Sequence, residues 1–292
     1  MAAAVTGPAG GPAAEPAAPR VARTAVVEDP SSLAPGVVVG EHAVVAAGAE
    51  LGEGVFVGPG VVVEAGARVG AGTRLLAGSV VRGRVALGAR CQVGPYAVLG
   101  GEPADTAFHG EESRVVVEDD VTIREFVTVH RATGEGAVTR VGAGTLLLSY
   151  SHVSHNCDVG RGCVITNGVQ LGGHARVGDR ANLGAGSLVH QFCRIGAYAM
   201  FGAASAANQD VLPYAMARGN PARHYRLNTV GLRRAGFEGE RYRHVEAALR
   251  ALRRRDTAAL EELATVSEEA AQVLEFVRTT KRGVARFVTG GR

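Results

Sequence analysis

The stretch "VGRGCVITNGVQLGGHARVGDRANLGAGSLVHQFCRIG", residues 159–196, places an aliphatic residue at every sixth position, and a glycine often follows it. The same phase runs through residues 33–99, 117–129 and 141–201. Four residues after each of these anchors stands a small or β-branched residue, such as Thr73 or Ser187. A fixed period kept over so much of the chain is the signature of a repeat protein.

A repeat of this length is too short for a helical hairpin, but it suits a short strand followed by a turn. The anchor and the small residue would both point inward. Three such units make a triangular coil of about 18 residues, and coils stack roughly 4.8 Å apart. The sequence therefore predicts a parallel β-solenoid. All four cysteines, Cys91, Cys157, Cys163 and Cys193, fall on the small inward position, where we expect them to be core residues.

The phase breaks at "GGEPADTAFHGEES", residues 100–113, where the inward positions would fall on Pro103 and His109. We expect an extruded loop there and a shorter irregular stretch at 131–137. Such loops on a rigid scaffold often carry function. The period ends near Asp210, and from about Gly239 apolar residues recur at helical spacing. We therefore divide the chain into a solenoid, 26–212, and a C-terminal helical domain, 213–292.

Composition restricts the function classes. The net charge is only +3, which gives no reason to expect a nucleic-acid partner. Residues 1–25 are rich in Ala, Pro and Gly, and we interpret them as a disordered tail. They have no basic region of a signal peptide and are broken by prolines, so they fit neither a signal peptide nor a membrane span. We therefore expect no stable membrane insertion and a cytoplasmic protein.

Four of the nine histidines align when the chain is folded at about 18 residues per coil. Val153, Leu171 and Val189 then stack in successive coils. His152, His155, His174 and His190 lie close to these three anchors along one edge, and none takes an inward position. Aligned imidazoles favour proton transfer or metal binding, because histidine titrates near neutral pH.

Several blocks of sequence are specific in combination. They are "SHVSHNCDVG", "LGGH", "VHQFCRIG", "NQDVLPYAMARGNPA" and "GLRRAGF", together with "VTVHR" at 127–131. These blocks resemble those of the acyl-carrier-protein–UDP-N-acetylglucosamine O-acyltransferases, in the hexapeptide-repeat acyltransferase superfamily. The resemblance implies a left-handed parallel β-helix, a homotrimer with active sites between neighbouring prisms, and acyl transfer in lipid A synthesis without cofactor or metal.

The resemblance also assigns roles to residues. His155 matches the general base, and Gly173 matches the residue whose N–H binds the oxyanion. Asp105 matches the carboxylate that binds the sugar hydroxyls. The matches to other contacts with the sugar, diphosphate or acyl chain are His152, His174, His190 and Gln191, and the matches to nucleotide contacts are Asn228 and Arg234. The partners implied are UDP-N-acetylglucosamine and acyl carrier protein, which the Arg-rich tail would dock.

Some positions depart from the family pattern. Asn156 follows the catalytic histidine, where the family often has Asp; an amide can orient the ring but cannot stabilise its charge. Polar contacts of the family are replaced at Ala107, Val230 and Ala235, and chain-length positions hold Ala203 and Pro221. These changes leave open a different UDP-amino sugar or acyl donor. Two further hypotheses are a zinc hydratase of the gamma carbonic anhydrase type and a catalytically silent scaffold.

Overall fold

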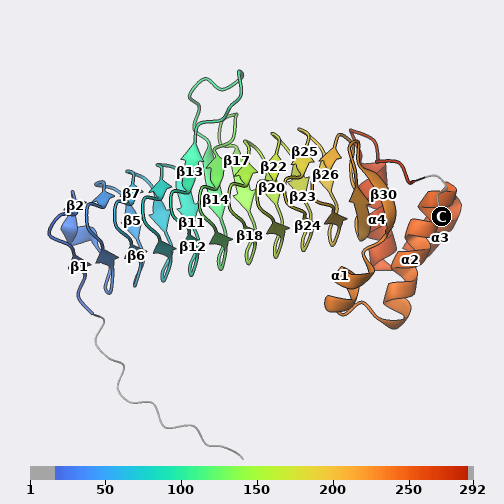
Figure 1. Ribbon diagram of the computed structural model, residues 1–292, viewed down its shortest axis with the longest axis horizontal. Coiled ribbons are helices and arrows are strands. Elements are labelled where there is room, and N and C mark those ends of the chain that lie inside the picture. The colour runs from blue at the N-terminus through green and yellow to red at the C-terminus, as the bar shows by residue number, and fades with distance from the viewer. Residues whose placement is uncertain (1–16, 289–292) are drawn as a thin grey trace, which may run out of the picture.

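A computed structural model describes residues 17–288, and in this range the chain forms a long parallel β-solenoid with helices at one end (Figure 1). The expected disordered tail falls largely outside the described residues. The described strands begin at Arg20, and the last strands run on to Leu227, beyond the boundary at 212 that we expected. These last strands extend the wall because they pair with it even though the six-residue phase has ended.

Three sheets form the faces of the prism. Sheet A contains β1 (Arg20–Val21), β3 (Val38–Val39), β6 (Phe56–Val57), β9 (Arg74–Leu75), β12 (Gln92–Val93), β15 (Thr122–Ile123), β18 (Leu146–Leu147), β21 (Val164–Ile165), β24 (Asn182–Leu183), β27 (Met200–Phe201), β29 (Ala215–Arg218) and β30 (Arg223–Leu227). Sheet B contains β2 (Val26–Val27), β4 (Val44–Val45), β7 (Val62–Val63), β10 (Val80–Val81), β13 (Val98–Gly101), β16 (Thr128–His130), β19 (His152–Val153), β22 (Gln170–Leu171), β25 (Leu188–Val189) and β28 (Ala206–Ala207). Sheet C contains β5 (Glu50–Leu51), β8 (Arg68–Val69), β11 (Val85–Leu87), β14 (Arg114–Val117), β17 (Val138–Val141), β20 (Asp158–Val159), β23 (Arg176–Val177) and β26 (Arg194–Ile195).

The predicted inward pattern is confirmed. Val153, Leu171 and Val189 are register partners in β19, β22 and β25, and all three are buried. The four cysteines are buried and free. Burial raises the pKa of the Cys157 thiol to about 12, so it is a packing group rather than a nucleophile.

A steric constraint explains why glycine often follows the aliphatic anchor. A Cβ added to Gly70 would come within 2.5 Å of the backbone of Gly88 in the next coil. At the second turn position the backbone is left-handed even for residues with side chains, as at Arg90, where φ is 56°. At the corners that carry glycine, stacking thus brings the backbones of neighbouring coils close together, and glycine permits this approach.

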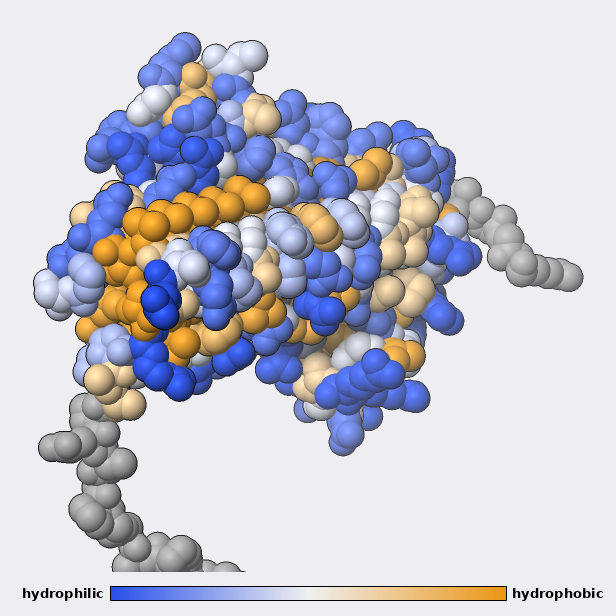
Figure 2. Space-filling model, turned by 60° about the vertical axis from the view of Figure 1, so that its left-hand side comes forward, coloured by the Kyte–Doolittle hydropathy of each residue, from blue (hydrophilic) through white to orange (hydrophobic). Residues whose placement is uncertain are grey.

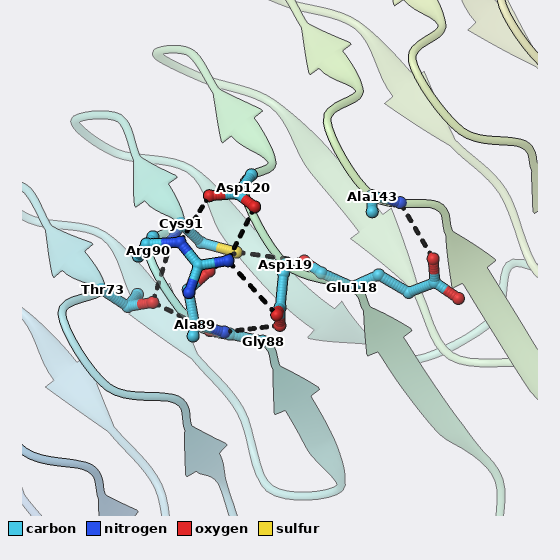
Figure 3. Close-up of polar contacts among 9 residues, drawn as sticks. All are labelled: Thr73, Gly88, Ala89, Arg90, Cys91, Glu118, Asp119, Asp120 and Ala143. Atoms are coloured by element: carbon cyan, nitrogen blue, oxygen red, sulfur yellow. Dashed lines mark hydrogen bonds and ion pairs between the residues drawn. The ribbon is translucent and has the colours of Figure 1, made fainter.

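Side chains fasten neighbouring coils along the edge between sheets C and A (Figure 3). The Asp119 carboxylate accepts the N–H of Ala89 at 2.9 Å. Arg90 donates to both oxygens of Asp120, at 2.7 and 2.8 Å. Thr73 Oγ1 donates to the Gly88 carbonyl and accepts from the Cys91 N–H. These contacts satisfy turn groups that the sheets leave unpaired.

Two stretches leave the wall. The chain between β13 and β14 forms the extruded loop that projects at the top of Figure 1, and residues 131–137 form a second, shorter one beside it. The first is the loop that the sequence predicts at 100–113. Both emerge where sheet B turns into sheet C, so they share one edge of the prism.

The C-terminal end of the molecule is helical, as the apolar spacing predicts. Its helices are α1 (Thr229–Arg234), α2 (Gly239–Arg254), α3 (Thr257–Ala264) and α4 (Glu268–Arg278), and a short 3-10 turn, η1 (Pro30–Ser32), lies near the other end. Within 17–288, no helix combines the length and the apolar composition that crossing a membrane requires. A second core joins the helices to the last strands through Tyr214, Leu232 and Phe237.

A buried histidine secures this end. The Nε2 of His224 accepts the Leu212 N–H at 2.9 Å, and its Nδ1–H donates to the Ala285 carbonyl at 2.8 Å. The side chain is completely buried, and this burial lowers its pKa from 6.5 to about 4. The His224 ring is therefore neutral in the folded state.

Acidification should accordingly destabilise the protein. Between about pH 6.5 and 4 the unfolded chain binds a proton at His224 that the native state excludes, so stability falls as the pH falls. The difference between these two pKa values lowers the free energy of unfolding by roughly 3 kcal/mol at pH 4. We expect His224→Gln to be less stable at pH 7 but to lose less stability on acidification, as measured by urea unfolding. His244→Gln on α2 is the control; an unchanged pH dependence in His224→Gln would contradict this account.

Candidate functional site

The ring of His155 is held by an amide. His155 lies in the turn after β19, where sheet B meets sheet C, and only 8% of it is exposed. Its Nδ1 is 2.9 Å from Asn156 Oδ1, which also accepts the Thr133 N–H at 2.9 Å. The Asn156 Nδ2 donates to the Thr133 carbonyl, which fixes the orientation of the amide. His155 Nδ1 must therefore carry the proton, and Nε2 keeps a free lone pair.

A carboxylate approaches the same ring from the extruded loop. Asp105 Oδ2 lies 3.6 Å from His155 Nδ1. The Ala107 N–H, which donates to Asp105 Oδ1 at 3.0 Å, lowers the pKa of Asp105, and the nearby His155 and His174 lower it further. Asp105 is thus ionised at neutral pH, and it places a negative charge beside the histidine.

Glycine is required on the other side of the ring. A Cβ at Gly173 would overlap Nε2 of His155. The Gly173 carbonyl accepts the Phe192 N–H at 3.0 Å, whereas over the described part of the chain the Gly173 N–H has no hydrogen-bond acceptor. His174 packs edge-on against His155, with ring centroids 5.3 Å apart, and stacks on Phe192 at 4.5 Å. A free backbone donor therefore lies next to a free imidazole nitrogen.

A second histidine pair lies on sheet B. His152 Nδ1 is 2.8 Å from Thr128 Oγ1, and its ring packs edge-on against His130 with centroids 4.6 Å apart. Burial lowers the pKa of His152 to about 4 and also lowers that of His130. His130 Nδ1 is buried without a hydrogen-bond partner. Sequence reasoning missed His130 as a site residue, although "VTVHR" contains it.

Two further expected residues lie in the next turn of the same edge, where the Gln191 backbone lies against Gly172 and Phe192 stacks on His174. His190 and Gln191 follow β25, and both are exposed. Arg282, from the C-terminal segment, reaches His190 Nδ1 at 3.3 Å. They therefore extend the line of polar groups along sheet B toward the helical end.

Asn228 and Arg234 belong to another face. They line a cavity of about 580 Å³ with Val164, Asn182 and Met200, which are outward residues of sheet A. Asn228 caps α1: its Oδ1 accepts the Gly231 N–H, and its Nδ2 donates to the Tyr198 carbonyl. Arg234 is exposed at the last turn of α1. One chain thus does not bring these two residues together with His155.

Within residues 17–288, no three His, Cys, Asp or Glu side chains converge in the manner of metal ligands. The histidines instead pair with hydroxyl, amide, carboxylate and aromatic groups. This arrangement suits proton transfer and hydrogen bonding.

Comparison with known families identifies two regions. A family described as "Bacterial transferase hexapeptide (six repeats)" matches residues 48–83. A family described as "Udp N-acetylglucosamine O-acyltransferase; Domain 2" matches residues 210–285. The first match covers solenoid coils, and the second covers the helical end.

Whole proteins resemble the chain over a greater length. The acyl-[acyl-carrier-protein]–UDP-N-acetylglucosamine O-acyltransferase of Alkalilimnicola ehrlichii is 42% identical over 199 aligned positions, and the match covers 65% of this chain and 77% of that protein. That of Burkholderia thailandensis is 38% identical over 67% of this chain and 79% of its own. The crystal structure of the Moraxella catarrhalis UDP-N-acetylglucosamine O-acyltransferase superposes with a TM-score of 0.80 at 31% identity, covering 91% and 99% of the two chains. That of the Bacteroides fragilis enzyme gives 0.78 at 30%, covering 87% and 100%.

The amide clamp predicts the tautomer of His155. We expect ¹⁵N spectra of histidine-labelled protein near pH 8 to place the His155 proton on Nδ1, since Asn156 offers only an acceptor there. Asn156→Ala should give a mixture of tautomers, whereas Asn167→Ala, at another turn, should leave the spectrum unchanged. A wild-type His155 protonated on Nε2 would refute the clamp.

Proposed function

The chain belongs to the family of acyl-[acyl-carrier-protein]–UDP-N-acetylglucosamine O-acyltransferases, and we propose that it transfers a fatty acyl group, with a 3-hydroxyl, from acyl carrier protein to the 3-hydroxyl of UDP-N-acetylglucosamine. The observation that carries the proposed mechanism is the free Nε2 of His155 beside the backbone of Gly173.

The chemistry follows from that juxtaposition. His155 Nε2 takes the proton of the sugar 3-hydroxyl as its oxygen attacks the thioester carbon. The carbonyl oxygen becomes an oxyanion, to which the Gly173 N–H donates. When the tetrahedral intermediate collapses, the C–S bond breaks and the sulfur takes the proton back from His155. The products are the sugar ester and the free thiol of the carrier, so the ring ends as it began.

Asp105 supplies the charge that Asn156 lacks. The ring becomes a cation when it takes the proton, and an amide cannot stabilise that charge. The Asp105 carboxylate, 3.6 Å from Nδ1, can do so while its other oxygen is held by the Ala107 N–H. In this chain the two roles of a conventional partner are thus divided: Asn156 orients the ring, and Asp105 stabilises its charge.

His152 acts as a neutral group. Because burial lowers its pKa to about 4, it offers hydrogen bonds but no charge to the sugar or diphosphate at neutral pH. His174, His190 and Gln191 extend the same line of contacts. Asn228 and Arg234 serve the nucleotide end of the substrate. Asn228 acts chiefly by shaping the cavity, since its amide is engaged in the cap.

A homotrimer would unite the two groups of residues. The histidines lie on sheet B and its edge, and the cavity of Arg234 lies on sheet A. If sheet A of one copy faces sheet B of the next, each cleft receives the histidines from one chain and the arginine from its neighbour. Cyclic closure with three copies gives three equivalent clefts.

The donor is an acidic carrier protein in the cytoplasm. Four arginines at the end of α2 are all exposed: Arg250, Arg253, Arg254 and Arg255. Only Arg250 has an ion pair among the described contacts, with Glu246 at 3.5 Å. Complementary charge of this kind steers association more than it adds affinity.

The function is tested by one assay. Purified protein is incubated with UDP-N-acetylglucosamine and a panel of acyl carrier protein thioesters, and the product is identified by mass spectrometry. We expect an O-acylated nucleotide sugar. His155→Ala should lower kcat/KM by about a hundredfold or more because the general base is lost, with the trimer intact. His244→Ala is the matched control, and full activity in His155→Ala would remove this residue from the mechanism.

The division of labour between Asn156 and Asp105 is tested by a double-variant cycle. We expect Asp105→Asn to lower kcat about tenfold or more, because the charge beside the protonated ring is lost. Restoring a carboxylate next to the ring with Asn156→Asp should recover part of that loss in the double variant. Strictly additive effects would mean that Asp105 only contacts the sugar.

A further inference from the structure

We propose that Tyr96, Phe126 and Tyr150 form the axial contact of the trimer and fix how its three prisms are aligned along their length. This inference rests on the proposed function only in assuming a shared site between copies. It assigns a role to three aromatic residues that the chemistry does not use.

The three rings form a continuous column. Tyr96 and Phe126 stack with centroids 5.4 Å apart, and Phe126 and Tyr150 stack at 5.0 Å with planes only 6° apart. They are 57%, 44% and 61% exposed. Each occupies the left-handed turn position on the edge between sheets A and B. We call them the aromatic column.

Neighbouring coils show that this position needs no ring. Gly60, Gly78, Gly168 and Gly186 occupy it before and after the column, also with positive φ. The Tyr96 ring lies over Gly78, where a Cβ would come within 2.6 Å of it. Aromatic residues replace glycine in three successive coils, and their outer surface remains in water in the single chain. Such an exposed apolar cluster indicates a partner.

The faces on either side indicate that the partner is a second copy. The outward residues of sheet B in the first five coils are all valine: Val26, Val44, Val62, Val80 and Val98. Figure 2, in which the N-terminal coils come forward, shows hydrophobic surface gathered over that end of the molecule. The outward residues of sheet A are mixed: Arg74, Gln92, Thr122 and Asn182 are polar, and the apolar ones include Val38, Phe56, Leu146, Val164 and Met200.

Sheet C differs from both. Its outward residues include Glu50, Arg68, Arg140 and Asp158, and Arg68 pairs with Glu50 at 3.2 Å. The strands of sheets A and B carry these apolar residues and no carboxylate, whereas those of sheet C carry charges of both signs. This difference fits a threefold assembly in which sheets A and B face neighbours and sheet C faces water. The edge between A and B then points at the axis, so the aromatic columns of three copies meet there. Because triangular prisms diverge from a shared edge, clefts open outward between them.

An interface between two solenoids does not by itself fix their alignment along the axis. Each coil resembles the next, so one prism could slide along another by a coil, roughly 4.8 Å, and still bury valine against apolar neighbours. The aromatic column is confined to three coils and breaks this repetition. Its coils include β16 and β19, which carry His130 and His152. Fixing the register here therefore sets the height of the histidines against the neighbouring cavity.

Cross-linking tests the placement directly. In Phe126→Cys the three new thiols would lie near the axis, and the four native thiols are buried. We expect a short bismaleimide to link Phe126→Cys chains into covalent dimers. Ala86→Cys, on sheet C, should stay single. Failure of Phe126→Cys to link, or equal linking of both variants, would overturn the axial placement whatever the enzyme activity is, because the readout does not use catalysis.

A second variant tests the role in alignment. Combined replacement of Tyr96, Phe126 and Tyr150 by Ser should leave the circular dichroism spectrum unchanged, since these rings are not core residues. We expect the trimer to dissociate at least about tenfold more readily in analytical ultracentrifugation, with activity falling at the same time. Val266→Ser removes another exposed apolar side chain and is the control. A wild-type monomer, or a triple variant as tightly associated and as active as wild type, would refute the proposal.

Discussion

In-register backbone pairing between successive coils constrains the rest of this molecule. From β1 to β29, strands pair in parallel with the equivalent strand one coil away, so residues distant in the chain lie one strand spacing apart. The pairing fixes where side chains lie along an edge of the prism, because each turn residue stacks on the equivalent residue of the next coil. His155 lies against Gly173 for this reason, and the proposed mechanism uses the glycine as much as the imidazole.

The two extruded stretches add chemistry that a uniform solenoid lacks. A wall of short strands offers repeated outward side chains but few groups that reach over an edge. The loop after β13 brings a carboxylate to His155, and residues 131–137 supply the backbone of Thr133 that fixes the Asn156 amide. The solenoid holds the turn residues in fixed positions, and the two loops add groups that the repeat does not supply. Both are needed to hold one nitrogen free while the other remains protonated.

The period alone predicted the strands, the buried cysteines and the stacking of Val153, Leu171 and Val189. The spacing of 18 residues per coil could not align His130 with the other histidines, because the coil that follows His130 is longer. Thr128 and His152 are register partners 24 residues apart. The Thr133–Asn156 clamp and the aromatic column cross the same irregular coils. The orientation of an amide or a ring is decided by local contacts and has no periodic signature. Residues from another copy cannot be placed by the period of one chain.

The proposed trimer requires each active site to take its base from one chain and its nucleotide contact from the next. Mixed trimers of His155→Ala and Arg234→Ala chains, assembled by coexpression and purified through two different tags, test it most directly. If the residues act across the cleft, one cleft of every mixed trimer receives both intact residues, so activity should return to about a third of the wild-type value. If both act within one chain, mixed trimers would be as inactive as the parents.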